Sequence, residues 1–333
     1  MDLRVSVLGA GSWGATVASL ASRNVPTLLW ARRPEQVDEI NTGHTNERYL
    51  PGVTLPADLR ATASIEEAVR GADVLVMGVP SHGFRGVLQE VSKHVRAWVP
   101  VVSLAKGLEE GSRLRMTQLI AELLPGHKAG VLTGPNLARE IMSGFAAASV
   151  LAMEDEAVGR EIQAIFRSGL FRVYTNRDVA GSELGGAFKN VIAIAAGMGD
   201  GMGVGDNTRA AVITRGLAEL TRLGIAMGGQ VSTFAGLAGM GDLIATGASR
   251  QSRNRHVGEQ LGKGRTIDEI VEEMHMVAEG VKTCRVVVEL ADQLGVEMPI
   301  AREVYGVVHE GRTAAQAYRG LTRRRPGAES EPG

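Results

Sequence analysis

Leu3-Arg-Val-Ser-Val-Leu8 runs directly into Gly9-Ala-Gly-Ser-Trp-Gly14, and this stretch predicts the fold of the first half of the chain. The β-branched run is typical of a strand, and a helical pattern follows the last glycine. Glycines between a strand and a helix allow a tight turn and let the backbone approach a pyrophosphate, which the N–H groups at the helix start bind. This context predicts a dinucleotide site at Gly9, Gly11 and Gly14, against the alternative of a simple glycine-rich turn.

The end of the second predicted strand carries two arginines, in Trp30-Ala31-Arg32-Arg33. In an NAD site an Asp or Glu at this place accepts hydrogen bonds from the ribose 2′-hydroxyl. This chain has neither, and Arg32 and Arg33 would instead neutralise a 2′-phosphate, which favours NADPH as the cofactor. The two arginines could also belong to a solvated loop, or one could stack on the adenine and tolerate NADH.

Strand and helix patterns alternate through the first half of the chain. The predicted strands are Leu3–Leu8, Thr27–Trp30, Val74–Val79, Val99–Leu104, Gly130–Thr133, Ala147–Leu151 and Phe171–Tyr174. The predicted helices between them are Trp13–Ser22, Ile65–Arg70, Arg85–Val95, Arg113–Leu123 and Glu156–Arg167. This alternation predicts an α/β domain with a parallel, doubly wound, Rossmann-like sheet.

After about Asp178 the strand pattern ends, and helical patterns continue along the chain. They cover 183–198, 207–226, 253–261, 267–273, 281–294, 299–309 and 313–323. We therefore expect a dinucleotide-binding domain at 1–178 and an all-α domain for substrate and catalysis at 179–323. The polar residues 324–333, rich in Pro, Glu and Gly, predict a disordered tail.

The composition narrows the class of partner. A formal net charge of −1 and 4% aromatic residues argue against a nucleic-acid surface. The single cysteine, Cys284, excludes an internal disulfide, and no cluster of His, Cys and Asp suggests a metal site. No signal peptide is expected at the N-terminus, and no apolar run approaches the ~20 residues that span a bilayer. These features predict a cytoplasmic protein that acts on a small molecule.

Three short motifs follow predicted strands, where ligands bind in open α/β sheets. They are Val79-Pro-Ser-His82, Ala105-Lys106-Gly107 and Thr133-Gly134-Pro135-Asn136. Lys106 is expected to contact a ligand, although an exposed surface lysine would fit the same pattern. His82 could be only a polar loop residue.

Lys189 lies in the most unusual setting in the chain, Leu184-Gly-Gly-Ala-Phe-Lys189-Asn190-Val-Ile-Ala-Ile-Ala-Ala196. Small and apolar residues surround it, and the next basic residue downstream is Arg209. Apolar surroundings lower the pKa of a lysine toward neutrality, so that it can exchange protons at about pH 7. The structural alternative is a lysine on a buried helix whose ammonium group reaches water.

Two further segments of the second half carry polar groups. Ser252 is a plausible N-cap of a helix that opens with Arg253, and arginines in a first helical turn form an anion site through both charge and dipole. Upstream, Gly239-Met-Gly-Asp242-Leu-Ile-Ala-Thr246 is a glycine-rich turn that places Asp242 and Thr246 one helical turn apart. The alternatives are a solvated basic helix end, and an Asp242 that only caps a helix.

Together these residues resemble bacterial NAD(P)-dependent glycerol-3-phosphate dehydrogenases over nearly the whole chain. The matching pieces occur in the expected order, and the segment around Lys189 is the most specific to that family. They are Gly9-Ala-Gly-Ser-Trp-Gly14, Asn46-Glu-Arg-Tyr-Leu-Pro-Gly52, Val79-Pro-Ser-His82, Lys106-Gly-Leu-Glu109, Gly134-Pro135, Glu183–Leu220 with Gly203-Val-Gly-Asp-Asn207, Gly239-Met-Gly-Asp242, Ser252-Arg-Asn-Arg255 and Val277-Ala-Glu-Gly280.

The resemblance implies the NADPH-dependent reduction of dihydroxyacetone phosphate to sn-glycerol 3-phosphate, which feeds glycerophospholipid synthesis. It implies that Lys189 transfers the proton at C2, and that Asn190, Asp242 and Thr246 orient it. The implied substrate contacts are Lys106, Gly134, Asn136, Ser252, Arg253 and Asn254. The implied cofactor contacts are Gly9, Gly11, Ser12, Trp13, Gly14, Arg32, Arg33, Lys106, Ala138, Arg253, Val277 and Glu279. The family usually has Ser where this chain has Asn136, whose longer side chain would change that contact.

Two other functions compete with this one. A hydroxy-acid or ketopantoate-type reductase also has a Rossmann domain and a helical domain, but the anion site at Ser252–Asn254 and the segment Gly239–Thr246 favour a phosphorylated triose. A nucleotide sensor without turnover would not need the polar set around Lys189. The apolar helices 183–198 and 207–226 could pack within their domain or across a homodimer.

Overall fold

The chain divides into two compact units, each with its own core. The computed structural model describes residues 3–274, 278–323 and 328. The first unit comprises Met1–Ala105 and Leu114–Val179, and the second comprises Lys106–Arg113 and Ala180–Gly333. The expected tail at 324–333 lies outside the described residues except for Ala328.

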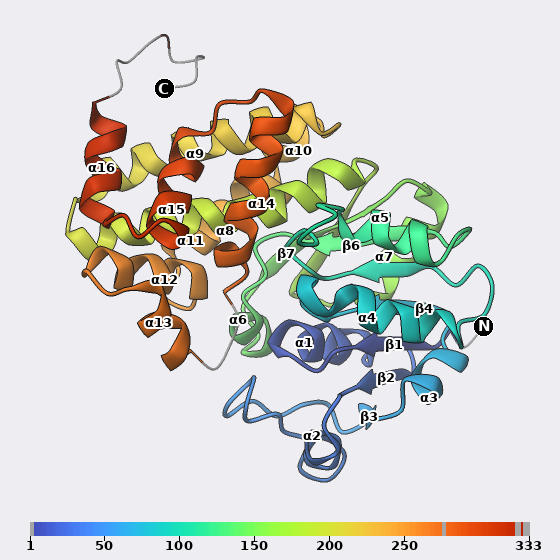
Figure 1. Cartoon of the computed structure of the whole chain (residues 1–333). Helices are drawn as coiled ribbons and strands as arrows, with labels where there is room; N and C mark the ends of the chain where they lie inside the picture. Colours follow the sequence, from blue (N-terminus) through green and yellow to red (C-terminus); the bar gives the residue numbers. More distant parts are fainter. Residues whose placement is uncertain (1–2, 275–277, 324–327, 329–333) are drawn as a thin grey trace. The chain divides into compact units, whose positions relative to one another are not determined.

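The first unit is built on an eight-stranded sheet in the order β3-β2-β1-β4-β5-β6-β7-β8 (Figure 1). The strands are β1 (Val5–Leu8), β2 (Thr27–Trp30), β3 (Arg60–Thr62), β4 (Val74–Met77), β5 (Val101–Ser103), β6 (Ala129–Thr133), β7 (Ala147–Met153) and β8 (Phe171–Asn176). The strand order reverses between β1 and β4, and ligands bind at the carboxyl ends of strands at such a point. The doubly wound α/β fold is therefore confirmed.

Helices pack on this sheet through two separate apolar cores. They are α1 (Ser12–Ala21), α2 (Pro34–Asp38), the π-helix η1 (Glu39–Gly43), α3 (Ile65–Arg70), α4 (Ser81–Ser92), α5 (Met116–Leu123), α6 (Ala138–Met142) and α7 (Glu156–Phe166). Val17 of α1 and Ile162 of α7 belong to one core, and Phe84 of α4 and Ile120 of α5 belong to the other. The sheet is thus covered by helices, as a parallel sheet requires.

The directions of two strands, β7 and β8, differ from the sequence prediction. The pattern predicts a parallel sheet throughout, but β7 pairs antiparallel with β6 and parallel with β8. The connection 134–146 holds only the five-residue α6 in place of the longer helix that usually crosses between parallel strands. The chain therefore turns back beside β6. The prediction also missed β3, whose three residues give too short a pattern to detect.

Two helix starts are also corrected. α5 begins at Met116 rather than Arg113, because Arg113 has a left-handed φ of 60° that no α-helix accommodates. α4 begins at Ser81, immediately after Pro80. His82 therefore lies in the first turn of a helix, with its side chain exposed, and not in a loop.

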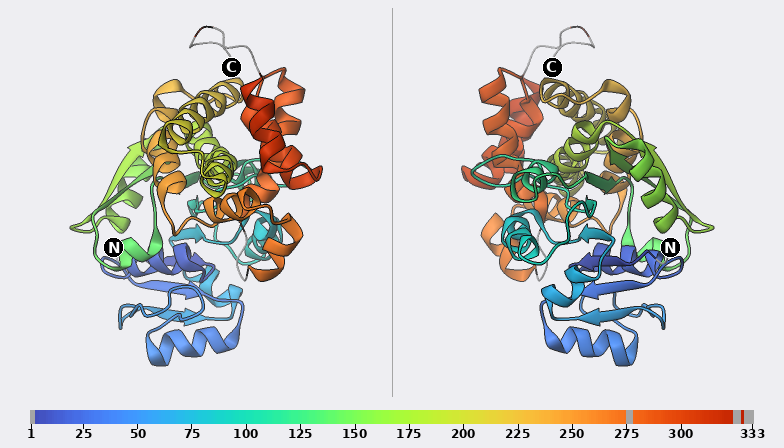
Figure 2. Two further views of the ribbon diagram at one scale, coloured as in Figure 1. Left: turned by 90° about the vertical axis from the view of Figure 1, so that its left-hand side faces the viewer. Right: turned by 90° about the vertical axis from the view of Figure 1, so that its right-hand side faces the viewer.

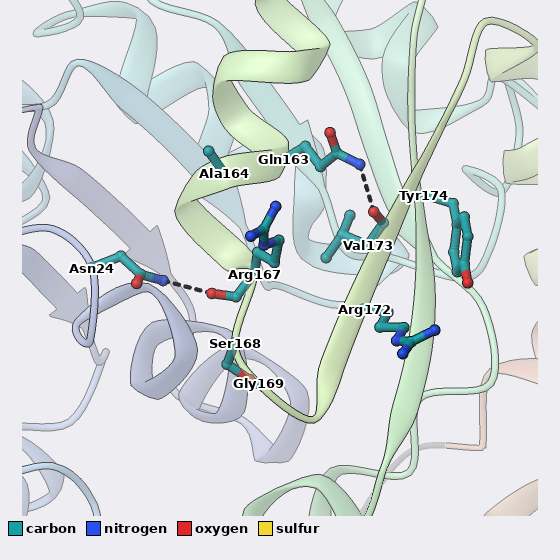
Figure 3. Close-up of a pocket in the computed structure, with 9 residues that line it drawn as sticks. All are labelled: Asn24, Gln163, Ala164, Arg167, Ser168, Gly169, Arg172, Val173 and Tyr174. Carbon is teal, nitrogen blue, oxygen red and sulfur yellow. Dashed lines mark hydrogen bonds between the residues drawn. The ribbon is translucent and has the colours of Figure 1, made fainter.

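β8 lies at one edge of the sheet, and local groups occupy part of its free edge. The Gln163 side chain donates to the carbonyl of Val173 at 2.6 Å, and the N–H of Ser168 donates to the carbonyl of Phe171 at 3.1 Å. Edge groups occupied in this way cannot pair with another strand. Figure 3 shows the surface hollow beside this edge, which no predicted site residue lines.

Every described element of the second unit is helical. The elements are α8 (Val179–Met202), α9 (Asp206–Ala226), α10 (Val231–Phe234), the π-helix η2 (Leu237–Gly241), α11 (Asp242–Ala248), α12 (Arg253–Gly262), α13 (Ile267–Glu273), α14 (Glu279–Leu294), α15 (Pro299–His309) and α16 (Ala314–Thr322). Among residues 3–274, 278–323 and 328, none of these or the earlier helices has the length and apolar character needed to cross a membrane.

α8 is buried at the centre of the second unit, with α9 alongside it (Figures 1 and 2). Glycines bring its backbone against that of α12. A Cβ at Gly197 would lie 2.1 Å from the carbonyl oxygen of Arg255, and one at Gly258 would lie 2.0 Å from that of Ile194. Such close contact fixes the register of the two helices. Of the two packing options for 183–198, α8 therefore takes the one within its own unit.

Candidate active site

Lys189 is buried on α8 and ion-paired. It is 4% exposed, and its Nζ lies 2.7 Å from Oδ1 of Asp242. The same ammonium group donates to the Thr246 hydroxyl at 2.5 Å, and that hydroxyl donates to Asp242 Oδ1 at 3.3 Å. A lysine that reaches water along the helix surface is therefore excluded.

Helix α11 explains how Asp242 and Thr246 reach the same ammonium group. It begins at Asp242, so the two side chains are four residues apart and share one face. The N-cap is Gly241, which shows that Asp242 does not cap the helix. The glycine-rich segment is thus not a turn but the π-helix η2 followed by α11. Gly239 is required there, because a Cβ would lie 2.1 Å from the carbonyl oxygen of Phe234.

Lys106 reaches the same carboxylate from the short segment of the second unit that precedes α5. Its Nζ lies 2.7 Å from Oδ2 of Asp242, while Lys189 holds Oδ1. One carboxylate therefore lies between two ammonium groups, and the ionised cluster keeps one net positive charge. Lys106 is thus a member of the buried cluster and not a surface lysine.

These surroundings lower the pKa of Lys189 to about 8, chiefly because burial removes water from its ammonium group. Asp242 raises this pKa and Lys106 lowers it. The effect of burial on this pKa therefore outweighs the opposing effect of the carboxylate. A lysine with this pKa is present in both protonation states near neutral pH. It also has a third N–H, beyond those given to Asp242 and Thr246, for a ligand oxygen.

Two buried asparagines lie next to this cluster. Asn190 Nδ2 donates to the carbonyl of Lys106 at 3.0 Å, and Asn254 Nδ2 donates to Asn190 Oδ1 at 2.9 Å. Asn254 Oδ1 in turn accepts from the N–H of Gly280 at 2.9 Å. Each of the two side-chain amides therefore donates one hydrogen bond through its nitrogen and accepts one through its oxygen, all with partners in the protein.

The N-terminus of α12 presents the predicted anion site. The Ser252 hydroxyl accepts from the N–H of Arg255 at 3.2 Å, which confirms it as the N-cap. The Arg253 side chain is exposed, whereas Arg255 turns back to Asp200 with an Nη2–Oδ2 distance of 2.7 Å. Of the two first-turn arginines, Arg253 is thus the one placed to meet an anion in solution.

The glycine loop of the first unit needs its glycines for two different reasons. A Cβ at Gly14 would lie 1.9 Å from the carbonyl oxygen of Gly9, and Gly9 itself has a left-handed φ of 123°. These two glycines serve the packing of the loop. A Cβ at Gly11 would meet no described atom within 4 Å, so this glycine instead keeps space open at the start of α1. Gly11 is also the N-cap and has no side chain to occupy the first N–H groups of the helix.

Residues that the sequence reasoning missed support this loop. The side-chain amides of Gln36 and Asn46 both donate to the carbonyl of Ala10, at 2.7 and 3.0 Å. The Ser12 hydroxyl donates to the carbonyl of Tyr49 at 2.8 Å. The segment that begins at Asn46 was noted as a matching motif, but its sequence gives no sign of this bracing role.

Trp13 and the two arginines lie around the same loop. The indole Nε1 of Trp13 is buried and has no hydrogen-bond partner among residues 3–274, 278–323 and 328. Arg32 is exposed after β2, and the guanidinium carbon of Arg33 lies 6.0 Å from the ring centre of Tyr49. A buried indole donor, open helix N–H groups and nearby arginines fit a dinucleotide phosphate.

Gly134 and Asn136 follow β6. Gly134 has a left-handed φ of 128°, and a Cβ there would crowd Ser149. The Asn136 side chain donates to the Ser149 hydroxyl at 3.1 Å, and that hydroxyl donates to the carbonyl of Thr133 at 2.8 Å. Within the described ranges, Asn136 Oδ1 and Thr133 Oγ1 are buried without a partner. The long Asn136 side chain is thus anchored on β7 and retains one open acceptor.

Comparison with known proteins decides the family. Two sequence models match, described as NAD-dependent glycerol-3-phosphate dehydrogenase N-terminus over residues 4–159 and C-terminus over 178–319. The chain belongs to the NAD-dependent glycerol-3-phosphate dehydrogenase family. A glycerol-3-phosphate dehydrogenase [NAD(P)+] of Sphingopyxis alaskensis is 63% identical over 333 residues and all of both chains. One from Mycobacterium avium is 58% identical over 98% of this chain and 96% of its own length.

Solved structures support the same family. A glycerol-3-phosphate dehydrogenase from Coxiella burnetii superposes with a TM-score of 0.93 at 35% identity, covering 97% of this chain and 99% of its own. A ketopantoate reductase from Ralstonia eutropha shares the fold only, with a TM-score of 0.58 at 17% identity over 95% of this chain and all of its own. The ketopantoate alternative is therefore not favoured.

Two of the three remaining cofactor contacts implied by the family resemblance lie at helix starts. Ala138 is the first residue of α6, and Glu279 is the first residue of α14. Val277 lies outside the described residues. Their roles in binding a cofactor stay predictions.

Proposed function

We propose that this chain reduces dihydroxyacetone phosphate to sn-glycerol 3-phosphate with NAD(P)H, in a reversible reaction that feeds glycerophospholipid synthesis. The observation that carries the proposal is the buried Lys189, paired with Asp242 and Thr246, with its pKa lowered to about 8. Membership of the glycerol-3-phosphate dehydrogenase family supplies the substrate.

The first unit would hold most of the cofactor. The pyrophosphate would bind at the start of α1, where Gly11 leaves space and the N–H groups of Ser12 and Trp13 are not used within the helix. Because the Ser12 hydroxyl already donates to Tyr49, its main-chain N–H is the better donor to phosphate. Arg32 and Arg33 would bind a 2′-phosphate, which favours NADPH over NADH. Further contacts in this proposal are Gly9, Gly14, Lys106, Ala138, Arg253, Val277 and Glu279.

The second unit would hold the reacting end of the substrate. Lys106 and Lys189 supply the positive charge that a phosphorylated triose needs, and the exposed Arg253 lies at a helix start that favours phosphate. Ser252 and Asn254 lie at the same helix start. From the first unit, the open oxygen of Asn136 and the main chain of Gly134 complete the proposed substrate contacts.

Lys189 would act as the proton donor in the reduction. NAD(P)H, when bound, would provide the hydride for C2, and the ammonium group of Lys189 would give its proton to the carbonyl oxygen of C2. Before transfer, its positive charge stabilises the negative charge that develops on that oxygen. Asp242 and Thr246 hold two of its N–H groups and so direct the third. In the reverse reaction, neutral Lys189 accepts the proton of the C2 hydroxyl.

An NADPH oxidation assay with two substrates tests the function. We expect oxidation with dihydroxyacetone phosphate and none with ketopantoate. Oxidation with ketopantoate instead would support the competing reductase, and NADPH binding without oxidation of either would support a nucleotide sensor. Repeating the assay with NADH gives the cofactor preference.

A homodimer in the cytoplasm completes the proposal. Ile225 near the end of α9 and Val231 at the start of α10 are 45% and 61% exposed, which offers apolar surface for a second copy. The cysteine Cys284 is buried and free, as a reducing compartment allows. Sedimentation of the purified protein would measure the oligomeric state.

A further inference from the structure

A chain of buried amides links four segments of the second unit. It begins at the main-chain N–H of Gly280 on α14 and passes through Asn254 of α12 and Asn190 of α8. It ends at the main-chain carbonyl of Lys106. The three hydrogen bonds measure 2.9, 2.9 and 3.0 Å, and both side chains are more than nine-tenths buried.

The two ends of this amide chain fix the direction of both side chains. A main-chain N–H can only donate, and a main-chain carbonyl can only accept. Asn254 must therefore point its oxygen at Gly280, which leaves its nitrogen for Asn190. Asn190 must then accept with its oxygen and donate to Lys106. Rotating either amide by half a turn would place two acceptors or two donors against each other.

The packing around Gly280 leaves the amide chain no freedom to relax. A Cβ at Gly280 would lie 2.7 Å from the carbonyl oxygen of Asn190 and 2.8 Å from Oδ1 of Asn254. The α14 backbone thus lies against both asparagines. Since α8 and α12 are also in backbone contact, a shift of any of the three helices to compensate for a lost bond would disturb this packing.

We propose that Asn254 is a positioning residue for carbonyl reduction, which acts through Asn190 to hold the main chain of Lys106. The proposal rests on the proposed function. Lys106 is the first residue of a short segment of the second unit, and its ammonium group pairs with Asp242. Holding its carbonyl on α8 keeps that ammonium group beside Asp242 and Lys189. This role differs from a direct phosphate contact by Asn254.

The variant Asn254→Asp tests the direction of the amide chain. Its carboxylate still accepts from Gly280, but it places an acceptor against Asn190 Oδ1 unless it is protonated. Burial among acceptors raises the pKa of the introduced carboxyl. Relative to the wild type at the same pH, we expect kcat for dihydroxyacetone phosphate to be about 10- to 100-fold lower at alkaline pH, as for a buried hydrogen bond replaced by two facing acceptors, and this ratio to recover as the pH falls. Asn254→Ala would lose activity at every pH. A loss in Asn254→Asp that does not change with pH would overturn the proposal.

Unphosphorylated dihydroxyacetone separates positioning from phosphate binding. If Asn254 positions Lys106, Asn254→Asp lowers turnover of dihydroxyacetone by the same factor as that of the phosphate ester. A variant that turns over dihydroxyacetone like the wild type would show a phosphate contact only, and overturn the proposal. Asn207→Asp, which makes the same change at an exposed residue of α9, is the matched control and should leave both substrates unaffected.

A structural readout keeps the test independent of activity. In protein labelled with ¹⁵N-asparagine, the side-chain N–H groups of Asn190 should exchange slowly with solvent in the wild type and faster in Asn254→Asp at alkaline pH. Unchanged exchange would overturn the amide chain even if the enzyme is active. If the wild type does not reduce dihydroxyacetone phosphate, the proposed function fails, and the exchange measurement still decides whether the amide chain exists.

Discussion

The glycine loop of the first unit and the lysine cluster of the second build their sites from different parts of the chain. The loop offers main-chain N–H groups within one continuous stretch, Gly9–Gly14, and needs glycines for space. The cluster offers side chains from three segments that are far apart in sequence, at Lys106, at Lys189 and at Asp242 with Thr246. In the proposed function the loop binds the cofactor through its shape and its main-chain N–H groups, whereas the cluster sets the pKa of Lys189.

This difference predicts how each site fails. A substitution at Lys189 should lower turnover while the cofactor still binds. A substitution in the loop should weaken cofactor binding. It should also lower the stability of the fold where the new side chain would clash with its neighbours. The following tests are ordered from the largest expected effect to the smallest.

Replacing the proton donor should have the largest effect. We expect Lys189→Met to bind NADPH normally and to lose about 10²- to 10⁴-fold in kcat, the usual contribution of general acid–base catalysis. Stopped-flow and steady-state assays would measure both. Lys263→Met, at an exposed lysine after α12, is the matched control. Turnover close to wild type in Lys189→Met would rule out the proton-donor role.

Two alanine substitutions should distinguish the glycine that is needed for packing of the loop, Gly14, from the one that leaves space for the cofactor, Gly11. In Gly14→Ala the new methyl group would lie 1.9 Å from the Gly9 carbonyl, so we expect a loss of about 1–3 kcal/mol in the free energy of unfolding. Gly11→Ala meets no described atom and should cost less than about 1 kcal/mol. Gly11→Ala should still weaken the binding of NADPH on the order of tenfold, or ~1.4 kcal/mol in binding free energy.

Denaturant titration and NADPH binding would be measured on both glycine variants. Wild-type NADPH affinity in Gly11→Ala would show that the pyrophosphate lies elsewhere.

The pH dependence should follow the pKa of Lys189, about 8. Reduction needs the protonated amine, so kcat/KM for reduction should fall about tenfold per pH unit above that pKa. Oxidation of glycerol 3-phosphate needs the neutral amine and should rise through the same range. Since Lys106 lowers the pKa of Lys189, Lys106→Met should move both limbs to higher pH. If the pH profiles for reduction and oxidation do not shift in Lys106→Met, Lys106 does not affect the pKa of Lys189.

The arginines after β2 should give the smallest effect because Arg32 is exposed to solvent. Changing both Arg32 and Arg33 to Ser should weaken the binding of NADPH by roughly 3- to 10-fold more than the binding of NADH. This difference between the two cofactors should shrink at high salt. Fluorescence titration with each cofactor would measure it. Equal losses for the two cofactors would mean that the arginines do not contact the 2′-phosphate.

The sequence by itself determined the features that depend on neighbours along the chain. The strand–glycine–helix order of 3–14, the strand alternation and the helical second half predicted the fold, because local geometry follows from local pattern. The N-cap at Ser252 followed for the same reason. The directions of β7 and β8 were not predictable in this way, since they depend on how the chain returns across the sheet.

Only the tertiary structure decided what surrounds each polar group. The apolar surroundings of Lys189 were visible in the sequence, and the family resemblance implied Asp242 and Thr246 as its partners, but the second lysine on Asp242 was not predicted. The amides of Gln36 and Asn46 on the glycine loop were equally hidden. A pKa or a buried hydrogen bond depends on groups within a few ångströms in space, and those groups come from segments that the sequence keeps far apart.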